Sequence, residues 1–153
     1  MDFLFTAEAG LTGLFLASFL AATLLPGGSE VVLLAVLLAH PEQALPAWVL
    51  ATVGNTLGGM TTYGMGRWLP DTDAVRTVAR VGAGKTAVRS QKMLAALKQH
   101  GAPLLVLAWV PFIGDLLCAA AGWLRLPWLA SALWMLLGKG ARYAALIAGI
   151  GAI

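Results

Sequence analysis

Four ionisable residues interrupt apolar stretches of the sequence: Glu30, Asp115, Lys139 and Arg142. If those stretches lie in a membrane, each charge at a helix centre costs about 2.5–3.5 kcal/mol on insertion scales. Charged groups persist at such depth when they pair with one another, face water, or bind an ion or a substrate. Two acids and two cations could together bind a proton, a small cation or an anionic headgroup. We therefore predict that these four residues form the functional site.

Each acid follows a proline at the same distance and begins a short apolar run. The two stretches read Pro26-Gly-Gly-Ser29-Glu30 and Pro111-Phe-Ile-Gly-Asp115. Proline breaks a helix, and a side-chain oxygen in the first turn that follows can satisfy free backbone N–H groups. One interpretation is that Ser29 and the two acids only cap short helices. The other is that the two tips meet, so that the acids bind a proton or cation, or pair with the two cations.

Lys139 and Arg142 are three residues apart, which places them on nearly the same face of a helix. An anion would find both cations there, together with the N-termini of the short helices. Six further residues are predicted to support the site by breaking helices, by capping, by hydrogen bonding or by anchoring the chain at the interface: Pro26, Ser29, Asn55, Tyr63, Pro111 and Arg125.

The composition is that of an integral membrane protein. Of the 153 residues, 59% are hydrophobic and 11% are charged, against about 25% charged in soluble domains. The mean hydropathy is +0.83. A single cysteine without a His/Cys cluster gives no sign of a metal site, and no Ser/His/Asp grouping suggests covalent catalysis. We therefore expect neither enzymatic activity nor a cofactor.

Five apolar stretches divide the chain, and we expect all of them to be helical. Residues 44–66 and 126–153 reach the roughly 20 residues that a spanning helix needs. The other stretches are too short or are broken at a proline, which is typical of re-entrant hairpins. For residues 102–123, a single proline-kinked spanning helix is the alternative.

The plan of the chain repeats, since Asp115 stands 85 residues after Glu30 in the same context. We predict a single all-α membrane domain over residues 1–153, built as an inverted repeat of a re-entrant helical hairpin and a transmembrane helix. Its predicted parts are a hairpin (10–40), a transmembrane helix (44–67), a basic segment (68–101), a second hairpin (102–125) and a second transmembrane helix (126–153). The two hairpins would enter the membrane from opposite sides, which is the plan of many secondary transporters.

Positive charge is concentrated in the middle of the chain. The formal net charge is +3; no Lys or Arg precedes Arg67, and seven occur from Arg67 to Lys98. Under the positive-inside rule, the basic loop 67–101 is cytoplasmic in a multi-pass protein of the inner (plasma) membrane. A helix within this loop would lie on the membrane surface, and a solvated linker is the alternative. We expect no nucleic-acid partner.

The stretch Gly54-N-T-L-Gly58, followed by Tyr63-G-M-Gly66-Arg67, resembles a family signature. It is similar to the G-x-x-x-G…Y-x-x-G-R pattern of the DedA family, also called the VTT or SNARE-associated Golgi-protein superfamily. LLPGGSEVV and WVPFIGDLL stand where that family has its two re-entrant segments, while GWLRLPW and GKGARYAA look like its short YqaA-type branch. The resemblance covers most of residues 10–150. It implies a protein that moves lipids, including undecaprenyl phosphate, across membranes, with a proposed coupling to protons.

One departure from the family pattern concerns the cargo. Many members carry arginines three residues before and three residues after the proline of the second hairpin, where this sequence has Ala108 and Gly114. The phosphate-binding role proposed for those arginines is therefore not carried over to this chain.

These patterns predict a flippase- or scramblase-like transporter of an anionic lipid or amphipathic anion, with proton coupling through Glu30 or Asp115 as an option. Its expected partners are membrane lipids with anionic headgroups. Further copies of the same chain are also expected, because two spanning helices barely shield two hairpins from lipid. Two other functions stay open: a structural membrane protein without transport, and a small-ion channel or exchanger.

Overall fold

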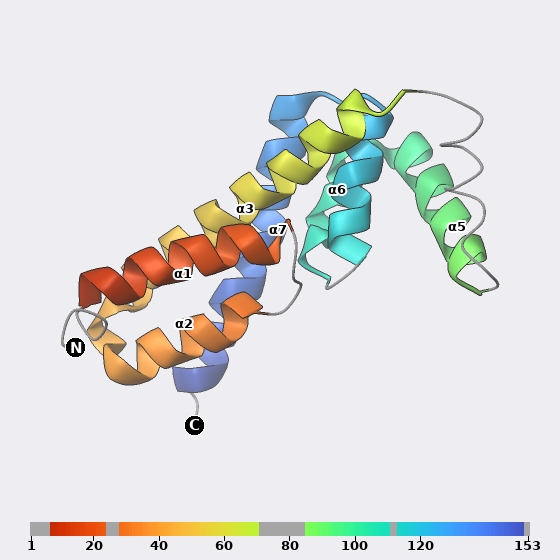
Figure 1. Cartoon of the computed structure of the whole chain (residues 1–153). Helices are drawn as coiled ribbons and strands as arrows, with labels where there is room; N and C mark the ends of the chain where they lie inside the picture. The colour runs from red at the N-terminus through yellow and green to blue at the C-terminus, as the bar shows by residue number, and fades with distance from the viewer. Residues whose placement is uncertain (1–6, 24–27, 71–84, 111–112, 152–153) are drawn as a thin grey trace.

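The computed structural model describes residues 7–23, 28–70, 85–110 and 113–151, and this part of the chain is entirely helical (Figure 1). In chain order its elements are α1 (Ala7–Ala21), α2 (Gly28–Ala39), η2 (Pro41–Gln43), α3 (Ala44–Trp68), α5 (Lys85–His100), η3 (Ala102–Trp109), α6 (Ile113–Trp123) and α7 (Trp128–Gly151). No strand occurs in these ranges. The predicted all-α class is confirmed.

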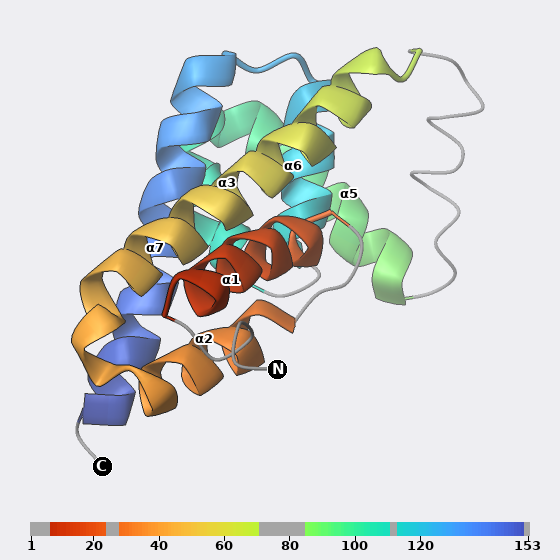
Figure 2. The same ribbon diagram turned by 60° about the vertical axis from the view of Figure 1, so that its left-hand side comes forward.

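Two pairs of short helical elements flank the long helices. In the first pair, α1 and α2 run in opposite directions and pack against each other (Figures 1 and 2). In the second pair, η3 and α6 pack against each other, so residues 102–123 form two adjacent elements and not one kinked helix. Pro26 and Pro111, the predicted helix breakers, lie outside the described residues.

The long helix α3 occupies the centre, where it contacts α1, α6 and α7. Its small residues permit the close approach. A Cβ on Gly54 would come within 2.7 Å of the Phe15 carbonyl oxygen of α1, and one on Gly66 would overlap the backbone of Ala119 in α6. The glycines Gly54 and Gly66 therefore let α3 pack closely against both helical pairs of the same chain.

The first element of the second pair is a 3₁₀-helix of eight residues, η3. Runs of this geometry longer than three or four residues are uncommon. It begins after Gly101, which has a positive φ of 67°, and it packs along α7, where a Cβ on Gly138 would overlap the backbone of Val106. Packing against α7 therefore stabilises the unusual 3₁₀ geometry of η3.

Basic residues of the middle segment lie on α5, which stands beside α6 at one side of the molecule (Figure 1). Leu97 is fully buried against the neighbouring elements, whereas Lys92 and Lys98 are exposed. A helix is therefore present in the predicted basic segment from residue 85 onward. Residues 71–84 of that segment lie outside the described residues, and placement of α5 on a membrane surface stays a prediction.

Among the helices of the described ranges, none is both long enough and apolar enough to cross a membrane. The predicted spanning helices 44–66 and 126–153 are thus found as helices α3 and α7, but they are not confirmed as membrane spans. Helix α7 begins at Trp128 and not at residue 126 because Pro127 precedes its first turn, a position that suits proline.

Candidate functional site

An ion pair joins the first helical pair to α7. The carboxylate of Glu30, in the first turn of α2, pairs with the guanidinium of Arg142. Arg142 also donates a hydrogen bond of 3.0 Å to the carbonyl oxygen of Trp109, the last residue of η3. One arginine therefore contacts both helical pairs.

Lys139 lies one turn earlier on α7 and is almost completely buried, with 2% of its surface exposed. Its ammonium donates to the backbone oxygen of Asn55 at 2.9 Å and to the side-chain oxygen of Asn55 at 2.5 Å. Within the described part of the chain, no carboxylate lies within 4 Å of it. A buried cation is thus held by neutral oxygens, which is an unusual arrangement because burial of an unpaired charge is costly.

Asp115 is the acid whose charge acts on Lys139. It stands in the first turn of α6 and is partly buried. Its carboxylate forms neither a hydrogen bond nor an ion pair with any described residue. Asp115 is therefore available to a proton, an ion or a substrate in a way that Glu30 is not.

Asn55 continues into a chain of hydrogen bonds. Its side-chain nitrogen donates to the hydroxyl of Tyr143 at 2.9 Å, and this hydroxyl donates to the hydroxyl of Ser29 at 2.8 Å. Ser29 precedes Glu30 in the first turn of α2. We call Ser29, Tyr143, Asn55 and Lys139 the polar chain. It crosses the interior from the first helical pair, through α3 and α7, toward α6.

The structure pairs Glu30 with Arg142 and joins Ser29, Asn55 and Lys139 in one hydrogen-bonded chain, whereas Asp115 interacts with Lys139 only through its charge. Tyr143 was not predicted, because a tyrosine in an apolar helix carries no signal that distinguishes it from packing. Its spacing of four residues from Lys139 is the one available hint, since it places both on the same helix face. Whether these residues bind a substrate stays a prediction.

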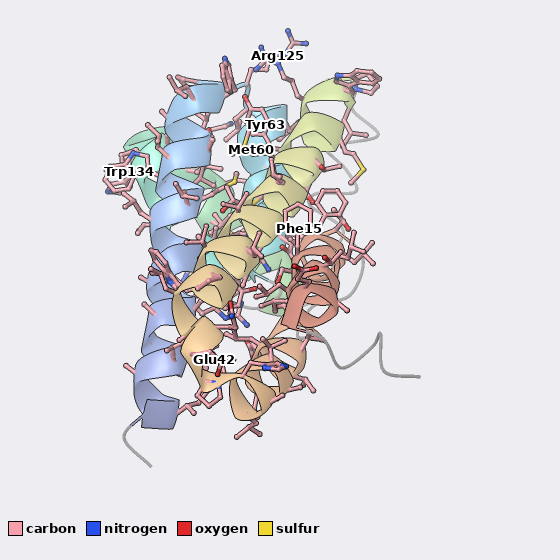
Figure 3. All side chains as sticks on the ribbon, turned by 90° about the vertical axis from the view of Figure 1, so that its left-hand side faces the viewer. Phe15, Glu42, Met60, Tyr63, Arg125 and Trp134 are labelled. Carbon is pink, nitrogen blue, oxygen red and sulfur yellow. The ribbon has the colours of Figure 1, made fainter. Side chains whose placement is uncertain are left out.

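Two predicted supporting residues lie elsewhere. Tyr63 donates to the carbonyl oxygen of Leu126 and accepts a hydrogen bond of 3.1 Å from Arg67. Arg125 is exposed, with a positive φ of 55° in the turn before α7. Figure 3 shows Tyr63 and Arg125 toward the same end of the molecule, with Glu42 toward the other. The structure does not bring Tyr63 or Arg125 to the polar chain.

The two positions that lack the family's arginines touch each other. A Cβ on Gly114 would overlap the backbone of Ala108, and Ala108 is itself buried. The first turn of α6 therefore packs against the backbone of η3 at the two positions where longer side chains would stand. In the described part of the chain, no group of three or more His, Cys, Asp or Glu residues could hold a metal ion.

The fold and the site define a class: an all-helical protein in which two short helical pairs and two long helices enclose a buried lysine, with an ion pair beside it. The chain belongs to the VTT domain family, whose model matches residues 25–151. This confirms the family that the sequence resembles.

Three relatives show how far the similarity extends. The inner membrane protein YqaA of Escherichia coli is 44% identical over 144 residues, which covers 90% of this chain and 89% of that protein. An uncharacterized protein of Haemophilus influenzae is 41% identical over 143 residues, covering 88% of this chain and 83% of that one. The inner membrane protein YqjA of E. coli is 33% identical over 128 residues, covering 77% of this chain and 57% of that one. No solved structure matches the chain.

Proposed function

We propose that the protein is a multi-pass inner-membrane transporter that moves an anionic lipid or another amphipathic anion. The observation that carries this proposal is Lys139, a cation that is 2% exposed and that, among the described residues, is held only by the neutral oxygens of Asn55. A buried cation without a paired acid is suited to receive an anion, because the anion would supply the missing charge.

The polarity of the molecule supports a location in the membrane. The buried face of α3 includes Asn55, Thr56 and Thr62. The large apolar side chains of α3 and α7 lie outside, with Leu45 70%, Leu57 47% and Leu137 59% exposed. Burying polar groups while exposing leucine is the reverse of a water-soluble fold and fits a lipid environment. The names of the relatives YqaA and YqjA also support an inner-membrane location.

In this environment the two helical pairs are proposed to be re-entrant hairpins that approach from opposite sides, with the basic loop 67–101 in the cytoplasm. The first turns of α2 and α6, which carry Glu30 and Asp115, would then lie near the centre of the bilayer. The contacts of Arg142 with Glu30 and with Trp109 support this arrangement, because they link the first turn of one hairpin to the turn of the other.

The headgroup is proposed to bind by exchange of anions. An incoming phosphate or carboxylate replaces Glu30 beside Arg142, so the guanidinium stays paired throughout. The same headgroup reaches Lys139, which gains its first anionic partner. Asp115, whose carboxylate is not engaged by a described residue, takes up or releases a proton as the anion enters or leaves, and this step would couple transport to a proton gradient.

Reconstitution into vesicles tests the proposal. Purified protein is placed in liposomes with a fluorescent anionic phospholipid, with and without a pH gradient, and transbilayer movement is followed by reduction of the outer-leaflet dye. We expect Lys139→Met and Arg142→Gln to lower the rate at least tenfold. The matched control is Lys98→Gln, which removes an exposed cation of α5. Wild-type rates in both site variants would overturn the proposal.

The same assay separates the other functions. A structural membrane protein would move neither lipids nor ions, and a small-ion exchanger would collapse a pH gradient without moving lipid. We also propose that the protein is a homo-oligomer, because α3 and α7 expose large apolar side chains such as Leu57 and Leu137 and two long helices barely shield two hairpins from lipid. Its mass in nanodiscs, measured by light scattering, tests this state.

A further inference from the structure

The polar chain has a fixed direction, which follows from the donors and acceptors available. The Lys139 ammonium can only donate, so the oxygen of the Asn55 side chain must face it. The amide nitrogen of Asn55 therefore faces Tyr143 and donates to its hydroxyl. That hydroxyl has one proton, which is directed to Ser29. The charge on Lys139 thus determines the direction of every hydrogen bond up to the first turn of α2.

Burial makes this direction obligatory. The exposed fractions are 2% for Ser29, 6% for Asn55, 0% for Tyr143 and 2% for Lys139. Bulk water cannot replace a lost partner at such positions, and an unsatisfied buried donor or acceptor is costly. When a residue at one end of the polar chain changes its hydrogen-bonding partner, the neighbouring residues of the chain therefore have to change theirs.

The two ends lie at the two candidate hairpin tips. Ser29 is next to Glu30 in the first turn of α2. Lys139 is acted on by the charge of Asp115 in the first turn of α6. The polar chain is therefore hydrogen-bonded to the first helical pair at Ser29, whereas at its other end Lys139 lies near Cys118 of α6 and interacts with Asp115 without a hydrogen bond.

We propose that Asn55 and Tyr143 are positioning residues that couple the two helical pairs. When the Lys139 ammonium binds another partner and no longer donates to the Asn55 side chain, the Asn55 amide is free to turn. Its oxygen then faces Tyr143. The Tyr143 hydroxyl then donates to Asn55, and Ser29 loses its donor at the tip of α2. The part of this inference that concerns transport rests on the proposed function, whereas the coupling itself is a property of the folded chain.

A double-mutant cycle measures the coupling without any transport assay. Ser29→Ala and Lys139→Met are made singly and together, and thermal unfolding is followed in detergent. Independent sites give additive effects. We expect the double variant to lose several degrees less than the sum of the single variants. In a Tyr143→Phe background, which removes the hydroxyl between them, the effects should become additive.

Additive effects in the chain with Tyr143 intact would overturn the coupling. If Lys139→Met does not fold, Lys139→Gln replaces it in the same cycle. Ser29→Thr keeps a hydroxyl at the tip and should behave as wild type, which a purely volumetric role of Ser29 would not allow.

A second readout follows the far end of the path directly. Cys118 is the one cysteine of the sequence and is buried in α6. It lies near Lys139, since a Cβ placed on Gly59 would be 3.4 Å from the Cys118 sulfur and 3.0 Å from the Lys139 nitrogen. We expect Ser29→Ala, on the opposite helical pair, to accelerate labelling of Cys118 by N-ethylmaleimide several-fold.

The matched control is Ser131→Ala, because Ser131 is also buried but its hydroxyl donates locally, to the carbonyl oxygen of Pro127 just before α7. Labelling at the wild-type rate in Ser29→Ala would contradict the coupling. If labelling shows the coupling while lipid movement is unaffected by the site variants, the proposed function fails and the coupling stands. If lipid movement depends on Lys139 while the effects in the double-mutant cycle are additive, the coupling fails and the proposed function stands.

Discussion

Glu30 and Arg142 form an ion pair between α2 and α7, and we propose that the same pair takes part in binding. The side chain of Arg142 is 16% exposed and that of Glu30 is 37% exposed, so the pair is only partly removed from solvent or lipid headgroups. An anion can therefore reach Arg142 without unfolding the surrounding helices. Lys139, one turn away, is enclosed more fully. The two cations thus differ in access, and we expect a headgroup to contact Arg142 before Lys139.

Removal of one member of the ion pair should cost more than removal of both. Glu30→Gln or Arg142→Gln leaves a half-buried charge with a lost partner, and we expect about 2 kcal/mol of destabilisation from each, below the 3–5 kcal/mol of a fully buried pair. Thermal unfolding in detergent measures this. The double variant should recover part of the stability while staying inactive in lipid movement. Full lipid movement in the double variant would contradict a role of this ion pair in transport.

Asn55 allows a sharper test of the Lys139 contact. Asn55→Asp keeps an oxygen for Lys139 and adds a compensating charge, so Lys139 should no longer offer an unpaired cation to a headgroup. We expect the variant to remain folded and to bind anionic lipid at least fivefold more weakly, as measured by native mass spectrometry of lipid adducts. Undiminished lipid binding would remove Lys139 from the headgroup site.

At the scale of elements, close backbone packing holds α3 against α6. A Cβ on Gly66 would overlap the backbone of Ala119, whereas nothing lies within 4 Å of a Cβ on Gly64 in the same helix. We therefore predict that Gly66→Ala lowers stability by about 1–3 kcal/mol through overpacking. Gly64→Ala should be neutral or stabilising by up to about 1 kcal/mol through helix propensity. The midpoints of thermal unfolding test this pair, and equal midpoints would show that α6 does not depend on the glycine contact.

The sequence predicted the elements better than it predicted their contacts. Hydropathy and proline positions gave the two helical pairs, and α3 extends over Ala44–Trp68, two residues past the predicted apolar stretch. The 3₁₀ geometry of η3 was missed because it depends on packing against α7 and not on local sequence. The bond between Lys139 and Asn55 joins residues 84 positions apart, so no local pattern could reveal it.

For the whole molecule we expect a topology in which the basic loop is cytoplasmic and α7 lies in the membrane. Single cysteines at Leu137, an exposed apolar position of α7, and at Lys98, an exposed position of α5, are introduced in a Cys118→Ala background. With a membrane-impermeant maleimide, the cysteine at Lys98 should stay unlabelled in intact cells and react rapidly in inverted vesicles. The cysteine at Leu137 should react slowly in both, because hydrocarbon excludes the reagent. Rapid labelling at Lys98 in intact cells would contradict the cytoplasmic loop.

We propose that two cations inside the protein, Lys139 and Arg142, select the anionic headgroup of a lipid that crosses the membrane. The most direct measurement is the ratio of transbilayer rates for an anionic and a zwitterionic phospholipid carrying the same dye, in the same proteoliposomes. We expect this ratio of rates to be well above one for the wild type and to fall to about one in Lys139→Met/Arg142→Gln while the protein stays folded. A ratio that is the same in both proteins would contradict selection of the headgroup by these cations.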